Sequence, residues 1–225
     1  MEIAERIDIP EVKNEQSSNK RFTVCGAEFV YLGLIGILTA FAGWLVENTF
    51  KAIVDGIIDA RFHVLPCIAA YALVPFALQI LLGDIDDLSF FGIKLFKNKT
   101  KRTKLISNIT AYVLMCSVVF IGELGIGSLW DKVFGVLLWD YSDTPLHITK
   151  YAGVIPTFGF GTGVWLLFKF VHKPLLNLFR KKANYKAATI IVAILGTLMC
   201  ADLIRLLLHI IIGHNAPMLW RIYLR

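Results

Sequence analysis

The stretch Leu138–Ile148 has the sequence LWDYSDTPLHI and separates two apolar segments that are each long enough to cross a membrane. Apolar residues also precede it, yet it presents an indole, a carboxylate and a phenol in succession at Trp139, Asp140 and Tyr141. A connecting loop does not need that composition, and indole side chains favour the membrane interface. We therefore interpret residues 124–148 as an interfacial lid whose polar end belongs to a site.

The composition around this stretch is that of a membrane protein. The chain has 225 residues, of which 56% are hydrophobic and only 18% are charged, with a mean hydropathy of +0.65. An ordinary soluble domain has about a quarter charged residues, and a membrane span needs about 20 apolar residues. Five stretches qualify: Cys25–Glu47, Val64–Gly83, Leu105–Gly127, Tyr151–Val171 and Ala188–Gly213. The predicted fold class is an all-α polytopic transmembrane helix bundle of about five spans.

The basic residues predict how this bundle is oriented. Most of the 23 Lys and Arg residues fall in the N-terminal segment and in the loops after the second and fourth stretches, and such loops are cytoplasmic. We therefore expect a cytoplasmic segment over residues 1–24, a transmembrane domain over 25–213 and a short extracytoplasmic tail over 214–225. The net charge of +6 is explained by these loops beside a lipid bilayer, and no nucleic-acid partner is expected.

Ionisable residues are concentrated in the half of the spans that this orientation places outside. Charges inside a membrane are rare and normally face the bundle interior in pairs. Asp202, Arg205 and His209 are spaced three and four residues apart, so they share one helical face. A structural network of such pairs is one interpretation, and a solvated site open to the outside is the other. The predicted substrate-binding residues are Glu47, Arg61, Glu123, Trp139, Asp140, Tyr141, Asp202, Arg205 and His209.

Three further patterns predict local structure. Glu47, Lys51, Asp55 and Asp59 recur every four residues, which predicts a solvated stripe on a helical extension of the first span. Pro75 falls within the second span and should kink it. In the fourth span two glycines, at positions 159 and 163, have the spacing of a close helix contact, with an irregular backbone that lines a cavity as the alternative.

Several of these residues also carry a resemblance to a known family. Gly43-Trp44-Leu45-Val46-Glu47, Arg61 with Pro66 to Tyr71, Glu123 with Gly127, and Trp139-Asp140-Tyr141-Ser142 with Pro145 and Ile148 follow one another in order. Together they resemble the bacterial ABC-transporter permease family of the CmpB type, whose motifs include G-W-x-x-E and W-D-Y-S-x-x-P-x-N-I. The resemblance covers Leu32–Gly163, and His147 replaces the Asn of the motif. It implies a multi-pass protein of the bacterial cell (inner or plasma) membrane with an ATPase or another membrane subunit as its partner.

Three functions fit these observations. The first is a transporter permease or substrate-capture component for a polar or anionic small molecule, with arginines as ligands and carboxylates as proton carriers. The second is a membrane-embedded enzyme acting on a lipid-linked substrate at the outer leaflet, and the third is an accessory membrane subunit. Whether the chain is an enzyme stays open, and we predict no cofactor and no metal site. The sequence lacks a phosphate-binding G-x-x-x-x-G-K-[ST] loop, so a permease of this kind would take energy from another subunit or an ion gradient.

Overall fold

The computed structural model describes residues 21–85, 87–96, 100–213 and 217–224. Residues 1–20 of the predicted cytoplasmic segment therefore lie outside the described residues. The same holds for two lysines of the first basic loop, at positions 97 and 99, and for the beginning and the end of the predicted tail, residues 214–216 and 225.

Within the described residues, four helices are long and apolar enough to cross a membrane. They are α1 (Phe29–Val54), α4 (Lys101–Phe134), a continuous helix made of α5 (Val154–Leu166), the π-helical turns η1 (Leu167–His172) and α6 (Lys173–Lys182), and α7 (Tyr185–Gly213). Thr100 caps α4 by accepting a hydrogen bond from the Thr103 N–H, and Gly135 ends it in the left-handed conformation. These helices confirm the predicted all-α polytopic fold.

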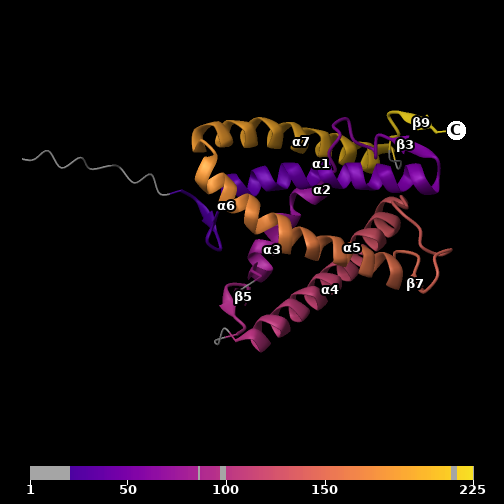
Figure 1. The fold of residues 1–225 in the computed structure, drawn as a ribbon. Coiled ribbons are helices and arrows are strands. Elements are labelled where there is room, and N and C mark those ends of the chain that lie inside the picture. The colour runs from indigo at the N-terminus through magenta and orange to yellow at the C-terminus, as the bar shows by residue number, and fades with distance from the viewer. Residues whose placement is uncertain (1–20, 86, 97–99, 214–216, 225) are drawn as a thin grey trace, which may run out of the picture.

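The second predicted span is not one long helix. The chain is non-helical over residues 60–68 and then forms α2 (Ala69–Ala72) and α3 (Val74–Leu82). Pro75 lies in the first turn of α3, where its missing N–H costs least, so it breaks the helix and does not merely kink it. The segment still leads back to the end of the bundle where α1 begins (Figure 1), and there the Gln79 amide donates a hydrogen bond to the Cys25 carbonyl.

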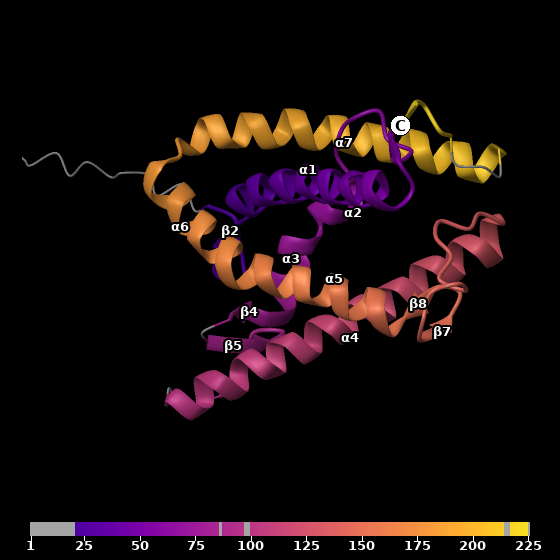
Figure 2. The ribbon, with the colours of Figure 1, turned by 45° about the vertical axis from the view of Figure 1, so that its right-hand side comes forward.

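Short strands join the ends of the helices. Three small sheets are local, formed by β1 (Thr23–Val24) with β2 (Ala27–Glu28), by β4 (Gly83–Asp84), β5 (Asp87–Phe90) and β6 (Ile93–Lys94), and by β7 (His147–Thr149) with β8 (Ala152–Gly153). The fourth joins distant parts of the sequence, because β3 (Ile57–Asp59) pairs antiparallel with β9 (Arg221–Tyr223). The ends of α1 and α7 therefore lie at the same end of the bundle, and α4 ends on that side too (Figures 1 and 2).

Apolar packing is concentrated at the opposite end. One buried cluster joins the start of α1 to α6 and α7 through Tyr31, Leu32 and Leu176, and a second joins α3 and β5 to α4 and η1 through Leu88 and Phe168. The end that holds β3 and β9 is instead built largely from polar contacts, which are described below.

The contact between α4 and α5 depends on a different glycine from the predicted pair. A Cβ added at Gly161 would collide with Cys116 of α4, whereas one added at Gly159 or Gly163 meets nothing within 4 Å. The predicted close contact at the Gly159/Gly163 pair is therefore wrong. The irregular-backbone alternative is also wrong for these two residues, because both lie in the regular helix α5.

Candidate functional site

The first polar group of the site is centred on Glu47 of α1. Gly43 lies one turn earlier on the same face, and a Cβ there would collide with the ring of Tyr71 from α2. The glycine thus lets that ring lie against α1, and the Tyr71 hydroxyl donates to Glu47 Oε1 over 2.7 Å. Arg61 donates from Nε to Glu47 Oε2 over 2.7 Å and adds an ion pair through Nη2. Both carboxylate oxygens of Glu47 are therefore bound by groups from residues 60–82, the segment that leads back along the bundle after β3 and is called the returning segment below.

A buried carboxylate, Asp59, positions that returning segment. The predicted helical stripe is wrong at this residue, because α1 ends at Val54 and Gly56, with φ +64°, turns the chain into β3. Asp59 is fully buried, pairs with Lys51 at 3.0 Å and accepts from the Arg61 N–H at 2.9 Å. Burial acts to raise the pKa of Asp59, but the hydrogen bonds and positive charges of Lys51 and Arg61 outweigh it and leave the pKa below its usual value.

The backbone next to Asp59 is strained. Arg61 and Phe62 have φ values of +51° and +67°, a region that costs a non-glycine residue about 1–2 kcal/mol. The strained turn is held on one side by the bond from the Arg61 N–H to Asp59 and on the other by Arg205, whose Nη2 donates to the Phe62 carbonyl over 2.6 Å. Strain of this kind gathers at functional sites, and here it directs Arg61 toward Glu47.

The second polar group is centred on Asp202 of α7. Its carboxylate accepts from the N–H groups of Val64 and Leu65 at 2.9 and 3.2 Å, lies 3.2 Å from His63 Nδ1, and accepts from Arg205 Nε at 3.0 Å. Asp202 is buried. It therefore pairs with Arg205, and it also anchors the non-helical part of the returning segment to α7.

The third polar group is centred on Glu123 of α4. It accepts from the Tyr141 hydroxyl at 3.1 Å and from the Thr157 hydroxyl of α5 at 2.9 Å. Burial raises the pKa of the Tyr141 phenol, and the carboxylates of Glu123 and Glu47 raise it further. The phenol therefore stays a hydrogen-bond donor, and Glu47 lies within electrostatic range of the interfacial segment.

The structure brings six of the nine predicted site residues into these three groups and leaves three outside them. Trp139 acts indirectly, because its indole N–H donates to the Tyr151 carbonyl over 2.8 Å and ties the interfacial segment to the start of α5. Asp140 is exposed and accepts from the Ser142 N–H within its own turn. His209 is also exposed and contacts the Arg205 carbonyl.

Four residues of the site were missed by sequence reasoning. In the sequence Tyr71 is only one position of the family motif, and Asp59 falls on the predicted solvated stripe. His63 directly precedes the predicted span Val64–Gly83, and an ionisable side chain at that place is a usable signal. Thr157 is one hydroxyl within an apolar segment, and nothing in the sequence distinguishes it.

The four long apolar helices define a multi-pass membrane protein, and a family match relates it to transporters. The chain belongs to the family described as "Putative ABC-transporter type IV", whose model matches residues 34–207. That match extends beyond the predicted resemblance and includes Asp202 and Arg205 of α7, although His209 lies outside it. Comparisons with curated proteins and with solved structures gave no match.

Proposed function

We propose that this chain is the permease or substrate-capture component of a transport system and that the polar cluster binds its polar or anionic substrate from the outside. One observation carries the proposal. Two tyrosine hydroxyls from separate segments, Tyr71 and Tyr141, donate to carboxylates on two different spanning helices, Glu47 and Glu123. Polar groups of distant segments that meet at one depth in a bundle are typical of a substrate or ion pathway.

The two arginines of the site, Arg61 and Arg205, have different roles in this proposal. Arg205 is held by Asp202 and by the Phe62 carbonyl, so its role is to fix the returning segment. Arg61 is about one-fifth exposed and has Glu47 as its main partner. An anionic group can bind Arg61 by taking the place of Glu47, and protonation of Glu47 favours this exchange. Substrate binding would thereby be linked to the uptake of a proton.

The interfacial segment supplies the lid in this proposal. The Tyr141 hydroxyl donates to Glu123, and the Trp139 indole donates to the Tyr151 carbonyl just before α5, which anchors the segment. Opening the lid breaks the hydrogen bond between Tyr141 and Glu123 and exposes the carboxylates to the outside. The family supports an ATPase partner as the energy source, and we place the chain in a bacterial cell membrane with its N-terminus in the cytoplasm.

The test is solute uptake by right-side-out membrane vesicles that contain the chain and its native partners. Vesicles are incubated with radiolabelled amino acids, organic acids, amines and phosphate esters. We expect one class to accumulate above vesicles without the chain, and Glu47→Gln to lower that uptake at least tenfold. The matched control is Asp55→Asn, which removes an exposed carboxylate from the same helix end and should transport normally.

Two results would contradict the proposal. Either no solute class accumulates, or the Glu47→Gln variant takes up solute as well as Asp55→Asn does. Depleting ATP and adding a protonophore in separate vesicles then distinguishes an ATPase from an ion gradient as the energy source.

A further inference from the structure

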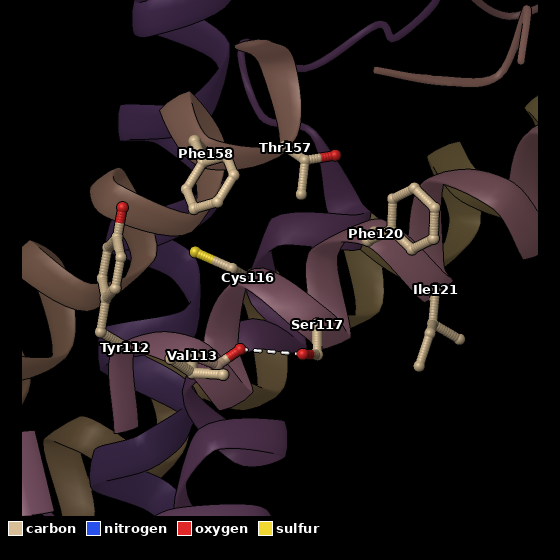
Figure 3. A pocket seen from close by; sticks show the side chains of 8 residues that line it. All are labelled: Tyr112, Val113, Cys116, Ser117, Phe120, Ile121, Thr157 and Phe158. Carbon is tan, nitrogen blue, oxygen red and sulfur yellow. Dashed lines mark hydrogen bonds between the residues drawn. The ribbon is translucent and has the colours of Figure 1, made fainter. Parts of the chain in front are cut away.

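A groove between α4 and α5 adjoins the Glu123 group. It has a volume of about 420 Å³, within the range of about 300–1,000 Å³ that is typical of ligand sites. Figure 3 shows its lining residues, which are mostly apolar or aromatic. Two of its three hydroxyls are bound elsewhere, because Ser117 donates to the Val113 carbonyl of its own helix and the Tyr112 hydroxyl is bonded to that of Thr162. The wall is therefore suited to a hydrocarbon ligand.

The groove opens where the bilayer would lie. Val113, Ile121 and Phe158 line it and are 56%, 67% and 50% exposed. They belong to the middle of α4 and to α5, both of which are long and apolar enough to span a membrane. A hydrocarbon chain can therefore enter the groove sideways from the lipid phase without crossing water.

The other end of the groove is polar through Thr157. This residue lines the groove and also donates to Glu123, and in Figure 3 its hydroxyl points to the side on which Phe120 lies. Glu123 is three residues beyond Phe120 on α4. An apolar groove and a carboxylate thus follow one another along the same helix.

Glu123 differs from the other two central carboxylates in its partners. Within the described ranges its hydrogen-bond partners are two neutral hydroxyls, and no cation pairs with it, whereas Glu47 and Asp202 are paired with arginines. A carboxylate has about four lone-pair positions, so two remain after Tyr141 and Thr157. A carboxylate inside a membrane normally has a cationic partner, and a ligand can supply one.

We propose that the groove and Glu123 together bind a single-chain membrane amphiphile with an amine headgroup. Its chain lies between α4 and α5, its ammonium group pairs with Glu123, and Tyr141 covers the headgroup. That this molecule is also transported rests on the function proposed above, whereas its binding is independent and is measured separately.

The test uses three probes that differ only in headgroup: hexadecylamine, hexadecanol and palmitic acid, each with a photoactivatable diazirine in the chain. The protein is reconstituted in lipid nanodiscs, illuminated with each probe, and the labelled peptides are mapped by mass spectrometry. We expect the amine to label the groove peptides, residues 112–121 and 157–158, at least tenfold more than the alcohol or the acid does.

Two variants separate the headgroup site from the groove. Glu123→Gln keeps one oxygen that accepts from one of the two hydroxyls, and its amide N–H can donate to the oxygen of the other. The variant should therefore fold and lower labelling by the amine about tenfold while labelling by hexadecanol stays unchanged. Val113→Trp fills the groove mouth and should lower labelling by all three probes. If either variant elutes as aggregate, the other decides.

The proposal is overturned if amine and alcohol label the groove equally, if Glu123→Gln leaves amine labelling unchanged, or if labels spread evenly over all spanning helices. The uptake assay with Glu47→Gln is unaffected by these outcomes, because Glu47 does not line the groove. Failure of amphiphile binding and failure of the proposed transport function are therefore distinguishable.

Discussion

Replacing Asp202 by Asn should destabilise the protein more than any other single removal of charge in the cluster. The Asp202 carboxylate is buried and receives hydrogen bonds from two backbone N–H groups and from Arg205, with His63 also in contact. Asn keeps the size of the side chain but removes the charge, and one of its two polar atoms cannot accept. The substitution therefore weakens the anchor of the returning segment and leaves Arg205 without its anion.

The size of the effect follows from these contacts. Removing one member of a buried ion pair costs about 3–5 kcal/mol, because the remaining charge is uncompensated. The Arg205 side chain is 25% exposed, so water compensates part of its charge, and Asp202→Asn should lower the free energy of unfolding by about 3 kcal/mol, the lower end of this range. Replacing both partners removes the unpaired charge, so Asp202→Asn with Arg205→Met should recover about half of that loss.

The assay is reversible unfolding in bicelles, followed by circular dichroism, of wild type, the two single variants and the double variant. Asp55→Asn is the control and should lie within about 0.5 kcal/mol of wild type, as surface changes usually do. A loss below about 1 kcal/mol for Asp202→Asn, or strictly additive losses in the double variant, would refute the assignment of a buried, coupled pair.

Three other predictions concern separate parts of the structure. Gly43→Ala should destabilise the protein by about 1–3 kcal/mol, because its Cβ would collide with the tyrosine ring of α2. Gly125→Ala has open space at its Cβ and should stabilise the protein by about 0.5–1 kcal/mol. Equal effects of the two variants in thermal melts would contradict the close packing of α2 against α1. Folding lowers the pKa of Asp59, so its contribution to stability is present above pH ~4 and is lost as the pH falls through the lowered pKa. Asp59→Asn should therefore flatten the dependence of the melting temperature on acid pH, and an unchanged dependence would contradict this role of Asp59. An impermeant maleimide should label Cys in place of Ser142 but not of Lys181 in intact cells, and the reverse pattern would invert the proposed orientation.

The long helices were predictable because their signal is local. Each spanning segment is an apolar run bounded by polar residues, and the structure extends these runs by several residues at most ends, as in α1, which continues to Val54. The returning segment was not predictable in the same way. Its composition is equally apolar, but its first part is held out of helical geometry by Asp202, more than 130 residues away. Hydropathy contains no term for such a distant hydrogen bond.

The sequence indicated where the charged residues of the candidate site lie, but not which of them pair with each other. The depth of each charge follows from counting residues along a helix, so Glu47, Arg61, Glu123 and Asp202 were expected at one end. Their pairing depends on the turn at Gly56 and on the left-handed backbone of Arg61 and Phe62. Neither of these two residues is a glycine, so the sequence does not indicate a left-handed turn there. Asp140 was expected to bind substrate, but its neighbour Tyr141 is the residue that contacts the Glu123 carboxylate. The sequence alone does not show which of two adjacent polar residues faces the bundle.

In the proposed function, the interfacial segment between α4 and α5 closes the site through Tyr141. The most direct test is solute uptake by vesicles carrying Tyr141→Phe, which removes only the hydroxyl that donates to Glu123. We expect the variant to take up solute at least tenfold more slowly than wild type, with a melting temperature within a few degrees of the wild-type value. Wild-type uptake by the Phe variant would contradict the claim and reduce the segment to a connector.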